Sequence, residues 1–126
     1  MSFDEGGVAS RSKFNPVRQY NKDKPDKRRV DFFMLGNNNH GMYFIIHADI
    51  HQGRNASNIG IPRDIQDLPT TQKAVVNSIV KSNLAIDPDG MHCLFMDNRY
   101  QCAELAILLG DKYQIRSCGT TRRNRN

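Results

Sequence analysis

The sequence lacks tryptophan and has only three cysteines among its 126 residues. Cys93, Cys102 and Cys118 form no C-x-x-C pair, so neither a zinc finger nor a disulfide framework is indicated. No apolar run approaches the roughly 20 residues of a membrane-spanning helix, and residues 1–10 lack the apolar segment of a signal peptide. We therefore expect an intracellular protein that does not associate with membranes.

Motifs of nucleotide binding and of nucleophilic hydrolysis are also missing. Gly6-Gly7 is not followed by the G-x-x-x-x-G-K pattern of a phosphate-binding loop, so use of ATP is not indicated. His47 and His51 have the i, i+4 spacing of a helical metal site. They stand in strand and loop context, however, and that spacing needs a helix to form a metal site. The scattered cysteines and histidines do not signal a nucleophile with a histidine partner.

What the sequence does contain is an excess of positive charge. Lysine and arginine number 18 against 13 aspartates and glutamates, which gives a net charge of +5 and a pI near 9.3. The cations gather in residues 11–29 and again in residues 116–125. Such clusters are typical of proteins that bind a polyanion, although similar runs also occur in solvated loops that only maintain solubility. Charge alone leaves both alternatives open.

The first half of the chain predicts strands around a basic loop, within one domain that covers residues 1–126. A short strand is expected at residues 1–5, and Gly6-Gly7 is expected to break it. Between Arg11 and Lys27 the chain holds mainly cations, asparagine and proline without periodicity, which predicts a basic loop at residues 6–28. Two runs rich in aromatic and β-branched residues then follow, at residues 29–35 and 42–47. The segment between them is rich in glycine and asparagine, which predicts a β-hairpin.

The second half of the chain predicts helices alternating with strands. The expected elements are a helix from Asp67 to Leu84, a buried strand from His92 to Met96, a helix from Tyr100 stopped by Gly110, and a last strand from Tyr113 to Cys118. The predicted order is β-β-β-α-β-α-β in an α/β fold. This order matches the start of a ribonuclease H-like fold, in which right-handed crossovers follow an antiparallel hairpin.

Asp4 and Asp97 each stand at the end of a predicted strand. In this topology the two strands are central, parallel neighbours, so the two carboxylates lie side by side. Carboxylate oxygens suit Mg²⁺, and paired Mg²⁺ ions serve phosphodiester cleavage by activating the attacking oxygen and stabilising the leaving one. The alternative is structural: Asp4 is an exposed terminal residue, and Asp97-Asn98 caps the next helix with Gln101 at capping-box spacing. Spacing alone favours this alternative.

Six short blocks carry a family resemblance. They are Phe3-Asp4-Glu5, Arg18-Gln19-Tyr20, Lys24-Pro25-Asp26-Lys27, Gly53-Arg54, Phe95-Met96-Asp97-Asn98-Arg99-Tyr100 and Cys118-Gly119-Thr120-Thr121-Arg122-Arg123-Asn124-Arg125. In content and order they resemble the catalytic core of piggyBac-type transposases, and the resemblance spans nearly the whole chain. It implies a ribonuclease H-like core in which Asp4 and Asp97 are the first and second catalytic, metal-binding aspartates.

The resemblance also implies a function and a location. It implies metal-dependent cutting and joining of DNA strands, with Mg²⁺ as the cofactor, DNA as the partner and the nucleus as the location. The oligomeric state stays open, with a dimer as one alternative. The cations expected to contact phosphates without reading bases are Arg11, Lys13, Arg18, Lys24, Lys27, Arg122 and Arg123.

The sequence departs from the family in three places. Residues 6–10 replace a more apolar and aromatic stretch, and Arg99 stands where an aromatic residue is commoner. The family also needs a third carboxylate beyond the last predicted strand, whereas this sequence stops at Asn126. We therefore expect a truncated, partial ribonuclease H-like fold that does not cleave DNA alone. The alternative function is a non-catalytic nucleic-acid-binding or interaction module derived from a transposon.

Overall fold

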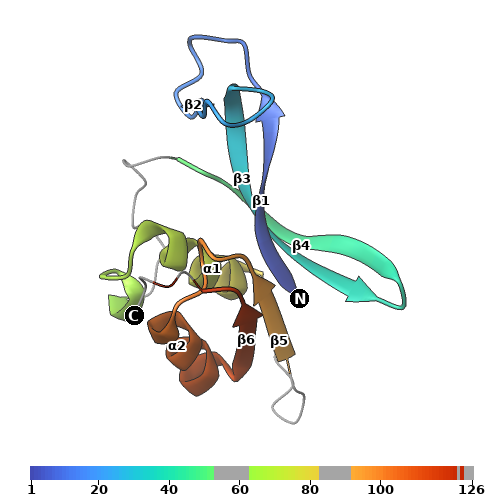
Figure 1. Ribbon diagram of the computed structural model, residues 1–126, viewed down its shortest axis with the longest axis vertical. Coiled ribbons are helices and arrows are strands. Elements are labelled where there is room, and N and C mark those ends of the chain that lie inside the picture. The colour runs from blue at the N-terminus through green and yellow to red at the C-terminus, as the bar shows by residue number, and fades with distance from the viewer. Residues whose placement is uncertain (53–62, 83–91, 122, 124–126) are drawn as a thin grey trace.

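The computed structural model describes residues 1–52, 63–82, 92–121 and 123. These residues form one twisted sheet with two α-helices packed at one end (Figure 1). The strands are β1 (Ser2–Ala9), β2 (Gln19–Tyr20), β3 (Arg28–Asn39), β4 (Met42–Ile50), β5 (His92–Met96) and β6 (Ile115–Gly119). The helices are α1 (Thr70–Lys81) and α2 (Ala103–Tyr113), and the short 3-10 helix η2 (Arg63–Ile65) precedes α1. No helix within these ranges is long and apolar enough to cross a membrane.

The sheet has the order β2-β3-β1-β5-β6, and β4 also pairs with β3. β1 pairs antiparallel with β3 over its whole length, from Ser2 to Ala9. Its parallel pairing with β5 is much shorter and involves only Ser2 and Phe3, whereas β5 and β6 pair in parallel throughout. When the two-residue β2 is left aside, the element order is the predicted β-β-β-α-β-α-β.

One apolar cluster holds both helices to the sheet. Its members include Phe3, Phe33, Leu35, Ile65, Val75, Val76, Ile79, Leu94, Met96, Tyr100, Leu105, Leu109 and Ile115. The members from each helix recur at the three- to four-residue spacing of a one-sided helix. Side chains alternate along a strand, so burial of Phe3 places Asp4 on the opposite, exposed side of β1.

Past its contact with β5, β1 continues with β3 as a two-stranded arm that projects from the packed end (Figure 1). We define the arm as residues 6–32. The basic loop predicted at residues 6–28 is therefore wrong at its start, because residues 6–9 belong to β1. Gly7 does not break the strand. The guanidinium of Arg29 occupies the space that a Cβ at position 7 would fill. Nε of Arg29 in turn forms an ion pair with Oδ1 of Asp31 over 2.5 Å.

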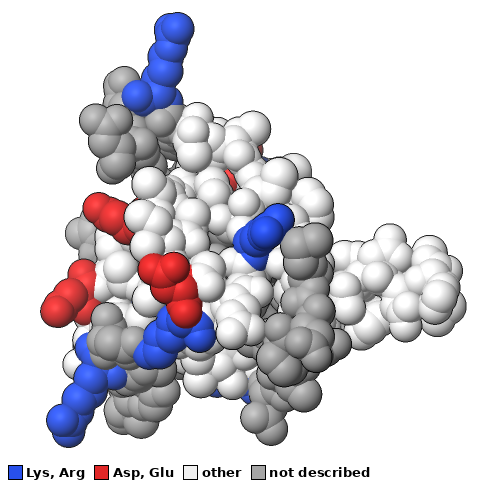
Figure 2. All heavy atoms as spheres, turned by 90° about the horizontal axis from the view of Figure 1, so that it is seen from below, with Lys and Arg blue, Asp and Glu red and all other residues white. Residues whose placement is uncertain are grey.

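The predicted β-hairpin is present, and its strands are longer than expected. β3 and β4 run to a tight turn at His40 and Gly41, whose φ angles of 50° and 81° are those of a two-residue hairpin turn. Residues 36–47 contain no charged side chain. They form the white projection on the right of Figure 2. The tip of this hairpin therefore carries no charged side chain, whereas the arm contains the cations gathered in residues 11–29.

The second helix differs from its prediction at both ends. α2 begins at Ala103, and Sγ of its N-cap Cys102 accepts a hydrogen bond from the backbone N–H of Leu105 over 3.4 Å. The helix ends at Tyr113, and its C-cap Gln114 has a left-handed φ of 55°, so Gly110 lies inside the helix and does not stop it. The interpretation of Asp97-Asn98 as a helix cap is therefore wrong.

Candidate active site and nucleic-acid interface

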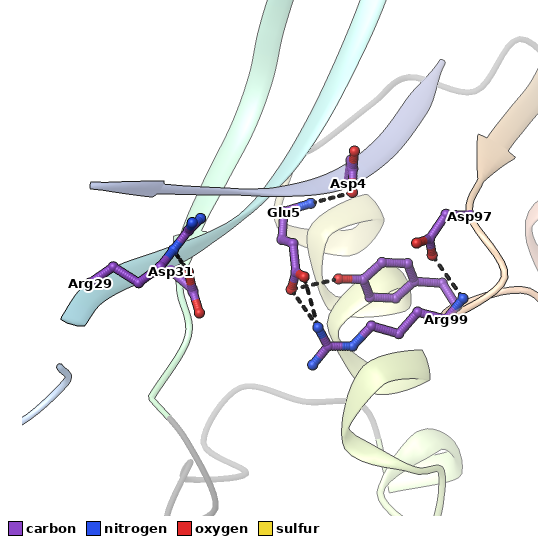
Figure 3. A network of polar contacts seen from close by, with 7 residues as sticks. Asp4, Glu5, Arg29, Asp31, Asp97 and Arg99 are labelled. Atoms are coloured by element: carbon purple, nitrogen blue, oxygen red, sulfur yellow. Dashed lines mark hydrogen bonds and ion pairs between the residues drawn. The ribbon is translucent and has the colours of Figure 1, made fainter. Parts of the chain in front are cut away.

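Asp4 and Asp97 lie where β1 parts from β5. Phe3 and Met96 are the last residues that pair between β1 and β5, and Asp4 and Asp97 follow them directly in the sequence. Neighbouring strands are about 4.8 Å apart, and both aspartates are exposed. Figure 3 shows their side chains on the two neighbouring segments. The sequence correctly predicted that the strands carrying Asp4 and Asp97 are parallel neighbours.

Each carboxylate is oriented by the backbone that follows it. Oδ1 of Asp4 accepts a hydrogen bond from the N–H of Glu5 over 2.8 Å. Oδ1 of Asp97 accepts one from the N–H of Arg99, also over 2.8 Å. The carbonyl oxygen of Asp97 accepts further bonds from the N–H groups of Tyr100 and Gln101. Asp97 therefore opens a tight turn between β5 and α2.

The two aspartates are a suitable donor set for a hard cation. Mg²⁺ is commonly bound through one or two carboxylates, and waters and phosphate oxygens complete its octahedral shell. Within residues 1–52, 63–82, 92–121 and 123, no group of three or more His, Cys, Asp or Glu side chains is arranged to hold a metal ion. Asp4 and Asp97 would therefore supply only part of the shell of a cation at this place. Other oxygens, such as those of water and phosphate, would supply most of it.

A network of Glu5, Arg99 and Tyr100 lies beside the aspartates, and the sequence did not predict it. Nη1 of Arg99 donates to Oε1 and Oε2 of Glu5 over 2.7 and 2.9 Å, and the Tyr100 hydroxyl donates to Oε2 over 3.2 Å. Burial and the carboxylate of Glu5 raise the pKa of Tyr100 well above its ordinary value, so the hydroxyl stays a donor. The one signal in the sequence was an arginine at position 99, where the family more often has an aromatic residue.

Gly119 brings the end of β6 close to the site. It stands opposite Met96 in the parallel register, and a Cβ on Gly119 would overlap the carbonyl oxygen of Met96. Only glycine allows this approach, which explains the glycine in the block that begins at Cys118. Arg123 is exposed after this strand, whereas the predicted phosphate ligand Arg122 lies outside the described residues.

The tip of the arm carries a basic hollow of about 390 Å³. It is lined by Ala9, Ser10, Arg11, Arg18, Pro25, Asp26, Lys27 and Arg28, that is, by four cations and one carboxylate. Three of the predicted phosphate ligands meet here, and Arg28 joins them without having been predicted. Lys13 lies apart beside the ring of Phe14, at 5.4 Å from its centroid, and Lys24 is exposed in a turn.

The arm and the carboxylates are separated along β1. Ala9 at the hollow is five residues from Asp4 on the same strand, which is about 17 Å at the rise of a β-strand. On the face seen in Figure 2, opposite the arm, blue and red side chains are both present on a mostly neutral surface. The described residues on that face therefore show no gathering of positive charge comparable to the hollow.

Comparison with known proteins gives one informative match. No protein-family model matches the sequence, and no curated protein matches it. The fold is similar to that of the transposase in the cryo-EM structure of the piggyBac transposase synaptic complex with hairpin DNA, with a TM-score of 0.74 and 23% identity. The match covers 99% of this chain and 23% of the transposase chain. It confirms the predicted fold class, a mixed α/β sheet like part of the ribonuclease H-like piggyBac core.

Proposed function

We propose that this chain is the part of a piggyBac-like transposase core that binds a divalent cation and contacts DNA. One observation carries the proposal: the parallel register of β1 and β5 makes Asp4 and Asp97 neighbours, although 92 residues lie between them. The similarity of the fold to a transposase supports the same conclusion. A protein with this role acts on chromosomal DNA, so the nucleus is its proposed location.

Asp4 and Asp97 are the proposed ligands of Mg²⁺. When bound, Mg²⁺ supplies charge neutralisation to the phosphodiester oxygens of a strand being cut. The chain contributes the position of the carboxylates, since Oδ1 of each is fixed by the N–H of a nearby residue. Glu5 is not proposed as a ligand, because Arg99 and Tyr100 occupy its oxygens.

The arm is the proposed DNA-binding element. Arg11, Arg18 and Lys27 around the hollow, together with Lys13, Lys24 and Arg123 elsewhere, would bind phosphates. Arg122 is proposed for the same role on the sequence alone. The hollow lies about 17 Å from Asp4 by strand rise, which corresponds to about five base-pair steps at 3.4 Å each. Backbone phosphates held by the arm would therefore place the carboxylates about half a helical turn away.

The 126 residues are proposed to bind DNA without cutting it. The resemblance implies three catalytic carboxylates, and within the part of the chain that the structure describes the candidate site has two, Asp4 and Asp97. Removal of one member of a catalytic unit abolishes most of its rate. A second candidate function, a DNA-binding module that does not use a metal, is favoured by the position of the cationic hollow on the arm, away from both aspartates.

Two measurements on the chain test these functions. Calorimetric titration with Mn²⁺ alone should detect binding that Asp4→Asn and Asp97→Asn each weaken at least tenfold. Fluorescence anisotropy with a labelled 30-base-pair duplex should detect binding that decreases steeply as the salt concentration rises. A chain that binds DNA and fails to bind Mn²⁺ would support the metal-free module. If DNA binding is absent or insensitive to salt, both candidate functions are wrong.

A further inference from the structure

The Glu5–Arg99–Tyr100 network connects the two segments that carry the candidate metal ligands. Glu5 follows Asp4 directly, and Arg99 lies two residues after Asp97. The ion pair between them joins residues 94 positions apart in the sequence. Figure 3 shows the side chains of Glu5 and Arg99 meeting between β1 and the turn that follows β5.

Backbone pairing does not reach the aspartates themselves. The ladder between β1 and β5 ends at Phe3 and Met96, and from there β1 follows β3 into the arm. The distance between the Asp4 and Asp97 carboxylates is therefore not fixed by a hydrogen-bonded ladder. The Glu5–Arg99 ion pair is a cross-link between the two segments immediately past the end of the ladder.

Each member of the ion pair also holds one aspartate. The N–H of Glu5 donates to Asp4, and the N–H of Arg99 donates to Asp97, while their side chains bind each other. A shift of either side chain is thus transmitted through one residue to a candidate ligand. This arrangement is that of the outer-shell contacts that orient the ligands of a metal site.

The network is anchored in the core. Tyr100 is fully buried, and its ring contacts Phe3 edge to face at a centroid distance of 4.9 Å. Its hydroxyl fixes Oε2 of Glu5, whose side chain is only 18% exposed. Ion pairs on the open surface contribute little, but loss of one partner from a partly buried pair leaves a charge without compensation. The network should therefore hold its geometry in solution.

We propose that Glu5, Arg99 and Tyr100 are positioning residues that fix the Asp4 and Asp97 carboxylates relative to each other. Arg99 is the central member, because its side chain makes the ion pair with Glu5 of β1 and its backbone N–H binds the carboxylate of Asp97. The inference rests on the proposed function for the statement that the positioned carboxylates bind a cation. The positioning itself has a readout that needs no metal.

The variant Arg99→Met separates positioning from simple charge. Methionine keeps the aliphatic part of the arginine side chain and removes its positive charge near the candidate cation site. Electrostatics alone therefore predicts tighter Mn²⁺ binding. Positioning predicts weaker binding, by about tenfold or more, as for other residues that orient metal ligands. Arg99→Lys should restore binding, because both bonds to Glu5 come from the single nitrogen Nη1, and a lysine Nζ can make both.

The experiment measures two quantities on the whole chain. The first is the affinity for Mn²⁺ alone, by calorimetry. The second is the exchange rate of the Glu5 and Arg99 amide protons, by NMR without metal, since these are the protons bound to Asp4 and Asp97. Arg116→Met removes an exposed arginine from β6 and is the matched control. Glu5→Gln keeps the side-chain shape and serves if Arg99→Met does not fold.

Weaker Mn²⁺ binding and faster amide exchange in Arg99→Met, both restored by Arg99→Lys and absent from Arg116→Met, are the expected results. Unchanged amide exchange in Arg99→Met and Glu5→Gln would overturn the inference, as would Mn²⁺ binding as tight as in the unmodified chain. If the unmodified chain binds no Mn²⁺, the proposed metal function fails. Amide exchange then still decides whether the network positions the aspartates.

Discussion

The two halves of β1 lie in different surroundings. At its start the strand lies between β3 and β5, and Phe3 is buried among aromatic rings. At its end it pairs with β3 alone, and Val8 and Ala9 are exposed in the arm. The packed end holds the candidate carboxylates, and the arm holds the cationic hollow. Stability and affinity for polyanions should therefore respond to different substitutions.

The largest expected loss of stability comes from Phe3→Ala in the packed end. Phe3 is 1% exposed and contacts the rings of Phe33 and Tyr100. Truncation of a buried phenylalanine to alanine costs about 3–5 kcal/mol, which should be measurable by urea denaturation. Phe14→Ala in the loop of the arm is the matched control, because Phe14 is 84% exposed. A similar loss in both variants would contradict the division between packed end and arm.

Gly119→Ala should have the next largest effect. The added methyl group would overlap the carbonyl oxygen of Met96, and forced overpacking costs about 1–3 kcal/mol. Gly110→Ala is its control within the same half of the chain: Gly110 lies in α2 with open space where a Cβ would be. There alanine should stabilise the helix by up to about 1 kcal/mol. Opposite signs for the two substitutions in thermal unfolding would confirm the prediction.

Neutralisation of the hollow should change DNA binding and leave stability nearly unchanged. The triple variant Arg11→Gln, Arg18→Gln, Lys27→Gln should reduce the slope of log affinity against log salt by about 3, one for each phosphate contact. Arg11 and Lys27 are exposed and Arg18 is partly exposed, so the free energy of unfolding should stay within roughly 0.5 kcal/mol for each site. The control neutralises three exposed cations outside the arm, Arg63, Lys81 and Lys112. An equal reduction of the slope in the control would show that the arm is not the binding element.

The smallest expected effect concerns the titration of Tyr100. Burial and the nearby Glu5 carboxylate raise the pKa of Tyr100 in the folded protein, while the unfolded chain retains a value near 10. The unfolded state therefore loses this proton first, and stability should fall as the pH rises above about 10. The alkaline absorbance change that is lost in Tyr100→Phe should therefore occur above the ordinary tyrosine pKa of about 10. Ionisation of Tyr100 at that ordinary pKa would contradict its placement in the network.

The element order and the site strands were predictable because they depend on local pattern and on a topological rule. Met96 ends a short apolar run, Phe3 alternates with the polar residues Ser2 and Asp4, and right-handed crossovers place such strands in parallel. The length of β1 was not predictable in this way. Gly6-Gly7 is typical of a break, and its actual role depends on Arg29 from the facing strand, a contact that no local pattern contains.

The site was predicted in part. Strand ends identified Asp4 and Asp97, but the ion pair of Glu5 with Arg99 depends on where β1 leaves β5. The start of α2 was missed because its cap is Cys102, a residue type that is not a common N-cap. The Gly53-Arg54 block and Arg122 lie outside the described residues, so the phosphate-binding role predicted for Arg122 stays a prediction.

The uninterrupted pairing of β1 with β3 has a consequence for spacing along a bound duplex. Since the ladder runs in register from Ser2 to Ala9, the number of residues in β1 would set how far a phosphate bound at the hollow, as proposed, lies from the carboxylates. Insertion of two residues into each strand keeps every side chain on its face and lengthens the arm by about 7 Å. That is about two base-pair steps. Strand length would then determine where on the DNA the carboxylates are presented.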